Sequence, residues 1–190
     1  MKTIQTVALA ATVALAPLGA ASTASAVDKS AVLATYADIA HAAYQDSLTT
    51  AQSLQRAVDI LVKNPTEETL AAARNAWLKA RAPYQQTEAY RFGNAAVDDW
   101  EGKVNAWPLD EGLIDYVEKT SYGSESDENP IYTANVVANE KLMVNGEAVN
   151  AAPITKELLA EVLHEAEAVE ANVATGYHAI EFLLWGQDLN

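Results

Sequence analysis

Apolar residues recur at steps of three and four in the first part of the chain and form one stripe from Ser30 to about Lys63. No Gly or Pro interrupts the stretch, so it predicts one helix about 50 Å long at ~1.5 Å per residue. Asn64-Pro65-Thr66 ends this helix. Glu67 and Glu68 lie in the first turn of a second helix, where the positive end of the helix dipole favours carboxylates. Because the turn is short, the two helices are expected to form an antiparallel hairpin.

The pattern predicts that the second helix continues to Phe92, with a kink or division at Pro83. Short helices and turns are expected from Ala95 to Lys119. Residues 120–153 form an irregular excursion, in which Asn145-Gly146 between apolar residues indicates a β-hairpin.

Thr155 is expected to cap a third long helix, whose apolar positions run from Leu158 to Val169. A last helix, roughly Ala174 to Trp185, follows directly or after a slight break. The predicted fold class is therefore all-α: a bundle of long antiparallel helices with a small hairpin-bearing excursion around residues 120–153.

The first residues have the composition of a signal peptide. Lys2 precedes a short apolar run from Val7 to Leu18, and Ala24-Ser25-Ala26 is a small-residue cleavage site. The run is too short to span a bilayer, which disfavours an N-terminal anchor. We therefore expect residues 1–26 to be removed and the exported protein to begin near Val27.

Cysteine is absent from the chain, which excludes disulfides, thiolate metal sites and a lipid-modified cysteine anchor. A soluble protein of the bacterial periplasm fits best. The formal net charge of −14 argues against nucleic-acid binding, because no basic patch is present to neutralise phosphates. This charge is compatible with metal cations as ligands, although solubility alone explains it.

The buried stripe of the second helix turns polar along its length. It begins with apolar residues as far as Trp77 and continues, at the same spacing, with Arg81, Tyr84, Glu88 and Arg91. Buried charges are costly unless they are paired or coordinated. The stripe therefore indicates either a ligand site at a cleft or a structural set of ion pairs between Glu88 and the arginines, and spacing alone does not decide.

A second polar pair lies in an apolar segment near the C-terminal end. His178 and Glu181 are three residues apart on a helix and share one side, where an imidazole and a carboxylate can hold one metal ion. Gly176 would let another backbone or a ligand approach closely. The alternative is a His–Glu hydrogen bond that satisfies two buried polar groups, and the pair alone is a weak signal for a metal.

The segment 176–188 resembles the Gly-x-His-x-x-Glu signature of the imelysin family; it reads Gly-Tyr-His-Ala-Ile-Glu-Phe-Leu-Leu-Trp-Gly-Gln-Asp. This family includes iron-regulated and iron-uptake proteins of the bacterial envelope. The segment from Trp77 to Ala89 resembles the second-helix motif of the family. Trp107-Pro108-Leu109-Asp110 resembles its next motif. The matches follow the right order over essentially the whole mature chain.

The resemblance implies a helical fold of two bundle-like halves, of which residues 27–190 form the N-terminal one. It implies a metal site at His178 and Glu181, with Glu88 and Asp110 converging on the same cleft and Arg81 orienting a carboxylate. Family members continue beyond this motif, whereas the chain ends at Asn190, so we expect either a fragment or a more open site.

The chain has two further histidines, His41 and His164. Glu161 and His164 have the Glu-x-x-His spacing of di-iron bundles. They lie opposite the apolar stripe of their helix, which favours a solvated face. His41, between alanines of the first helix, is interpreted as a packed or surface residue.

Three functions are compatible with the sequence. The first is a periplasmic protein that binds a metal ion, iron before zinc, in iron uptake or handling with an envelope partner protein. The second, implied by the family resemblance, is a metallopeptidase, but the His-Glu-x-x-His helix of zinc peptidases is absent. The third is a helical interaction domain without metal.

Overall fold

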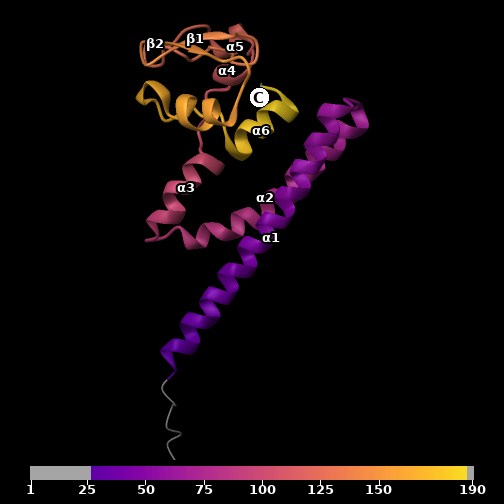
Figure 1. Cartoon of the computed structure of the whole chain (residues 1–190), viewed down its shortest axis with the longest axis vertical. Helices are drawn as coiled ribbons and strands as arrows, with labels where there is room; N and C mark the ends of the chain where they lie inside the picture. Colours follow the sequence, from indigo (N-terminus) through magenta and orange to yellow (C-terminus); the bar gives the residue numbers. More distant parts are fainter. Residues whose placement is uncertain (1–26, 188–190) are drawn as a thin grey trace, which may run out of the picture.

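The computed structural model describes residues 27–187 of the chain. The predicted signal peptide, residues 1–26 with its cleavage site, lies outside the described residues. Figure 1 shows a long helical hairpin beside a smaller part that carries the strands and the last helix.

The helical hairpin consists of α1 (Lys29–Lys63) and α2 (Glu67–Thr87), which pack along each other as predicted. Asp28 caps α1 by accepting a hydrogen bond from the Ser30 amide. Thr66 caps α2 in a reciprocal arrangement with Thr69, in which each side chain accepts from the other residue's backbone amide. Local sequence signals thus determine where each of the two helices begins.

The second helix is shorter than its pattern predicts. Pro83 lies inside α2 without ending it, and α2 stops at Thr87. A tighter 3₁₀ turn, η1 (Glu88–Tyr90), continues the chain direction in place of an α-helix to Phe92. The buried Thr87 hydroxyl donates to the Tyr84 carbonyl at 2.6 Å, so one of the last carbonyls of α2 has a side-chain partner.

The middle of the chain contains three short helices and the predicted hairpin. The helices are α3 (Ala95–Asn105), α4 (Glu111–Ile114) and α5 (Lys119–Tyr122). The antiparallel strands are β1 (Lys141–Val144) and β2 (Glu147–Asn150). Asn145 and Gly146 between them have φ values of 52° and 78°, which is the backbone that a two-residue hairpin turn requires.

The predicted third long helix is wrong. A short helix with π-type turns, η2 (Leu158–Leu163), ends before Glu165, whose φ is 53°. A 3₁₀ turn, η3 (Ala166–Ala168), follows. The Asn172 carbonyl accepts from the Glu165 amide at 2.8 Å, and the Asn172 side chain donates to the Ala166 carbonyl at 2.8 Å. These hydrogen bonds favour a turn where the apolar pattern favours a helix.

The last helix, α6 (Gly176–Trp185), joins separate hydrophobic clusters. Tyr177 and Leu184 pack with α1 and α2 around Trp77. Ala179 and Phe182 pack with Ile114 of α4 in a second cluster. A third cluster, between the strands and η2, surrounds Leu113, which is fully buried. Because α6 belongs to two clusters, its side chains are held firmly relative to α2, α3 and α4.

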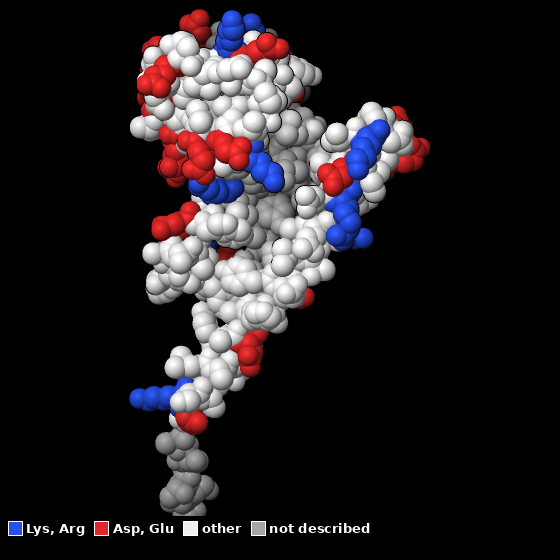
Figure 2. All heavy atoms as spheres, in the orientation of Figure 1, with Lys and Arg blue, Asp and Glu red and all other residues white. Residues whose placement is uncertain are grey.

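Much apolar surface remains exposed on the helical hairpin. Tyr36 and Ile39 of α1 are 56% and 58% exposed. Uncharged side chains dominate the hollow between the hairpin and the smaller part in Figure 2, where an open groove of about 940 Å³ follows α1 and α6. Within the described range, residues 27–187, no helix has the length and apolar character to cross a membrane.

Candidate metal centre

A close backbone contact fixes the start of α6 and thereby the position of His178. Gly176 has a φ of 86°, and a Cβ atom on it would lie 2.5 Å from the Val104 carbonyl oxygen of α3. Thr175, directly before, donates its hydroxyl to the Lys103 carbonyl at 2.9 Å. The expectation that Gly176 permits a close approach of another backbone is therefore confirmed.

His178 and Glu181 contact each other on one side of α6. The imidazole Nδ1 lies 3.0 Å from a carboxylate oxygen of Glu181, and the two side chains are 17% and 43% exposed. The Trp107 ring packs against the imidazole with 4.9 Å between centroids. A carboxylate only accepts hydrogen bonds, so His178 donates from Nδ1 and Nε2 is left as the atom that can bind a metal.

Glu88 lies in a different polar group. It is exposed on η1, and one of its carboxylate oxygens accepts from the Asn105 side-chain amide at 3.5 Å. The same amide donates to Glu101 at 3.1 Å, while the Arg81 guanidinium donates to the side-chain oxygen of Asn105. Arg81 therefore acts on the carboxylates through Asn105, in place of the direct Glu88–Arg81 ion pair that was one of the two interpretations of the stripe.

The polar stripe of α2 is satisfied by aromatic rings and by α3. The Arg81 guanidinium carbon lies 5.1 Å from the centre of the Tyr177 ring, a cation–π distance. Burial, followed by the charges of Glu101 and Glu88, raises the pKa of Tyr84 to about 12. Tyr84 therefore stays protonated at neutral pH as an uncharged wall of this network.

Arg91, the last residue of the stripe, forms ion pairs with α3. Its guanidinium lies 2.8 Å from Asp98 and 3.1 Å from Glu101. Among the described residues, Arg91 forms its salt bridges with α3, and the suggested Glu88–Arg91 ion pair is not formed.

Asp110 belongs to a buried amide network next to α4. The Asn129 side chain donates to the Asp110 carboxylate at 2.5 Å and to the Asn172 side chain at 2.7 Å. Asn129 and Asn172 are 4% and 0% exposed. Burial raises the pKa of Asp110, while the hydrogen bond from Asn129 lowers it by less. Asn129 thus links the Asp110 carboxylate, at the start of α4, to the Asn172 side chain.

Comparison with known proteins places this geometry in a family. Residues 40–190 match the model of the imelysin family, a stretch that includes every residue of the candidate centre. The chain belongs to the imelysin family. A 60-residue segment is 38% identical to iron-regulated protein A of Synechococcus elongatus. That segment is 32% of this chain and 17% of the relative, so the chain spans much less than the relative's full length.

The structure brings together two of the residues expected to form the metal site of this imelysin-family chain. His178 and Glu181 are in contact, whereas Glu88 and Asp110 have other partners. Within residues 27–187, no three His, Asp or Glu side chains lie close enough to hold one metal ion as they stand. The convergence of Glu88 and Asp110 on the pair therefore stays a prediction.

Sequence reasoning missed the contacts that shape the surroundings of the pair. Trp107 was noted only as part of a motif, yet its ring covers His178. Asn105, which bridges Arg81 to two carboxylates, had no signal of its own in the sequence. A polar residue at the end of an amphipathic helix is too common to predict such a bridge.

The interpretation of His164 as part of a solvated face is wrong. Its side chain is 9% exposed, and its Nδ1 atom is buried with no hydrogen-bond partner among the described residues. The chain turns at Glu165, directly after His164, so the helical face on which that interpretation rested does not continue. Glu161, at 67% side-chain exposure, does face solvent and pairs with Lys103.

Proposed function

We propose that this imelysin-family protein is an exported metal-binding protein of the bacterial periplasm, which binds iron through His178 in iron uptake or handling. The observation that carries the proposal is the 3.0 Å hydrogen bond from His178 Nδ1 to Glu181. Metal-binding histidines commonly donate their second ring nitrogen to a carboxylate, which fixes the tautomer and makes the ligating nitrogen more basic.

The surroundings of His178 support this role. The ring is packed against Trp107 and anchored on α6, so it pays little conformational entropy when it binds an ion. Nε2, the remaining ring nitrogen, is a donor for iron, zinc or another divalent ion. Glu181 holds the ring in its present position, and Glu88 and Asp110 remain predicted oxygen ligands.

The donor chemistry favours iron over a closed zinc site. Structural zinc is usually bound by four protein ligands and catalytic zinc by three, often with several imidazoles or thiolates, whereas the predicted ligands here are one imidazole and carboxylate oxygens. An ion with more coordination positions can add water or oxygen ligands from outside the described residues. The similarity to an iron-regulated protein agrees with iron as the metal.

Several features support an exported protein that works with partners. The predicted signal peptide and the absence of cysteine agree with a bacterial periplasm. We propose that residues 27–190 form the first of two helical halves, as the resemblance implies. An envelope iron-uptake protein is the proposed partner.

Calorimetric titration with Fe²⁺ under anaerobic conditions, and with Zn²⁺ in parallel, tests the proposal. His178→Ala should weaken binding about tenfold or more, since it removes the ligand. Glu181→Gln should bind more tightly than Glu181→Ala, because the amide oxygen still accepts from Nδ1.

His41→Ala is the matched control, because His41 is exposed on α1, whereas the pair lies on α6. Equal affinity in His178→Ala and His41→Ala would refute the proposed ligand. If Glu181→Gln loses as much affinity as Glu181→Ala while His178→Ala abolishes binding, Glu181 is itself a ligand and its assigned positioning role is wrong.

A further inference from the structure

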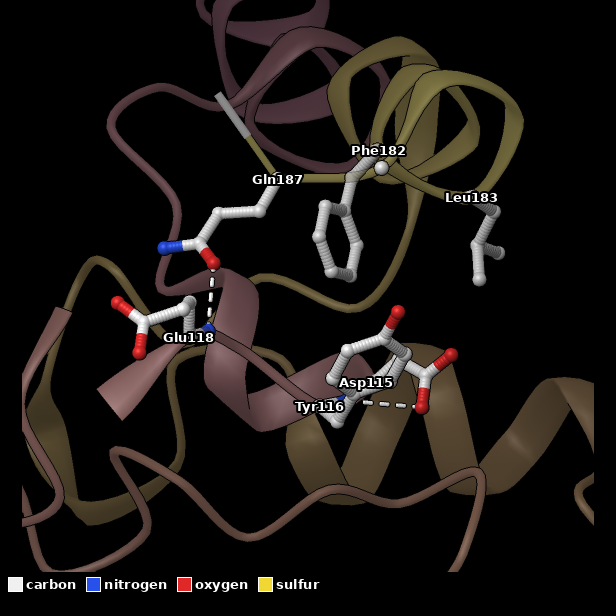
Figure 3. A pocket seen from close by; sticks show the side chains of 7 residues that line it. Asp115, Tyr116, Glu118, Phe182, Leu183 and Gln187 are labelled. Atoms are coloured by element: carbon white, nitrogen blue, oxygen red, sulfur yellow. Dashed lines mark hydrogen bonds between the residues drawn. The ribbon is translucent and has the colours of Figure 1, made fainter. Parts of the chain in front are cut away.

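A pocket of about 350 Å³ lies between the C-terminal end of α6 and the segment that joins α4 to α5. Figure 3 shows Phe182 and Leu183 of α6 facing Asp115 and Tyr116 across it. Gln187 closes one side, because its side-chain oxygen accepts a hydrogen bond from the Glu118 amide at 2.6 Å. The contacts that shape this pocket are separate from those that hold His178.

The walls of the pocket are largely apolar. Phe182 is 6% exposed, and it is held in place by the cluster that it shares with Ile114 and Ala179. Tyr116 is 77% exposed, and Leu183 is 57% exposed. A buried phenyl ring with two solvent-accessible apolar neighbours offers a surface on which a small apolar group can pack.

The charge of the lining is negative. Asp115 and Glu118 are the ionisable acids of the lining, and its seven described residues include neither Lys nor Arg. One carboxylate oxygen of Asp115 accepts from the Tyr116 amide at 2.8 Å, which fixes the side chain at the pocket.

The carboxylate of Glu118 caps α5 through the amides of Thr120 and Ser121, so it stays charged but points toward that helix. The last turn of α6 contains no basic residue, so the negative end of its dipole adds to the same field.

We propose that this pocket binds an organic cation, an alkylammonium or guanidinium group that is held beside Asp115 while its apolar part packs against Phe182 and Leu183. An anionic ligand would meet the Asp115 carboxylate and a helix C-terminus, so it is disfavoured. A bare metal ion would gain nothing from the apolar walls. The cation can belong to a free amine or to the Arg or Lys side chain of a peptide.

The first test is a ligand-observed NMR titration of the mature protein with phenethylammonium and with its neutral counterpart 2-phenylethanol. The cation should bind at least about threefold more tightly, and the preference should shrink with added salt, as expected for a half-exposed charge pair. The same titration with an acetylated, amidated Gly-Arg-Gly peptide distinguishes the two sources of the cation, a peptide side chain and a free amine. Tighter binding of the peptide identifies a protein partner. Tighter binding of the free amine identifies a metabolite.

Variants assign the binding to the pocket. Asp115→Asn should weaken phenethylammonium binding about threefold to tenfold and leave 2-phenylethanol unaffected. Tyr116→Ala, at an exposed position, should weaken both ligands. Asp99→Asn is the matched control, since it removes the same charge from an exposed position of α3.

Equal effects of Asp115→Asn and Asp99→Asn would show that only the net charge of the protein attracts amines, and the proposed site would be wrong. No preference for the cation over the alcohol would also overturn it. Because none of these variants changes His178 or Glu181, the outcome is independent of the metal titrations.

Discussion

Gly176→Ala tests whether the contact between α3 and α6 positions the candidate centre. Gly176 has a φ of 86°, and an added Cβ would lie 2.5 Å from the Val104 carbonyl oxygen and 2.6 Å from its carbon. Both atoms are backbone, so neither can move away as a flexible side chain would. The substitution must therefore strain Gly176 and separate the two helices.

Two costs add in this variant. A left-handed backbone costs a residue with a Cβ about 1–2 kcal/mol, and overpacking against the fixed backbone costs about 1–3 kcal/mol more. We expect the free energy of unfolding to fall by about 2–5 kcal/mol. Gly93→Ala separates the two costs, because Gly93 has a φ of 70° and nothing within 4 Å of its added Cβ. Its loss should stay at about 1–2 kcal/mol.

Urea unfolding followed by far-UV circular dichroism measures both losses on the mature protein. Tryptophan fluorescence should report the same displacement, because Trp107 packs against His178 on α6. If Gly176→Ala and Gly93→Ala lose the same free energy of unfolding, the backbone contact with Val104 contributes nothing and the reasoning is refuted.

Two further predictions concern the core and the buried amide network. Leu113→Ala should lower the free energy of unfolding by about 2–5 kcal/mol, because Leu113 is fully buried. Leu78→Ala is the control: Leu78 is 56% exposed, so its loss should change the free energy of unfolding by less than about 1 kcal/mol. Similar losses in the two variants would contradict the assignment of Leu113 to a buried cluster. Burial raises the folded-state pKa of Asp110, so the wild type should lose stability as the pH rises from the ordinary Asp range through that raised pKa. Asp110→Asn has no carboxyl group to titrate at this position, so it should not lose stability over that pH range. Parallel curves of the free energy of unfolding against pH for the two proteins would contradict the prediction.

The parts of the fold with local signals could be predicted from sequence. The helical hairpin follows from an uninterrupted apolar stripe and from the turn at Asn64-Pro65-Thr66, in which Thr66 caps α2. The β-hairpin follows from Asn145-Gly146, which tolerates the positive φ values observed there. In both cases the residues that define the turn lie within the turn itself.

The parts that depend on distant contacts could not be predicted. The turn after η2 has no Gly or Pro, and its left-handed residues are stabilised by Asn172 and by Asn145 of the hairpin, whose side-chain oxygen accepts from the Glu167 amide at 2.9 Å. A helical pattern cannot reveal such partners. His164 was misinterpreted for the same reason, because its burial follows from where the chain turns.

The candidate site shows the same division. The contact between His178 and Glu181 follows from their spacing on one helix, and a hydrogen bond between them was the alternative to a shared metal ion. The surroundings of the pair depend on α3 and on the segment after it, and neither Asn105 nor Trp107 could be paired with its partner from the sequence.

The most direct test of the central claim is nitrogen-15 NMR of the histidine side chains during titration with diamagnetic Zn²⁺. We predict that the Nε2 resonance of His178 shifts on binding while its Nδ1 stays protonated and hydrogen-bonded to Glu181. His41 and His164 should remain unchanged. Equal shifts of all three histidines, or a shift at His164 with none at His178, would contradict the account.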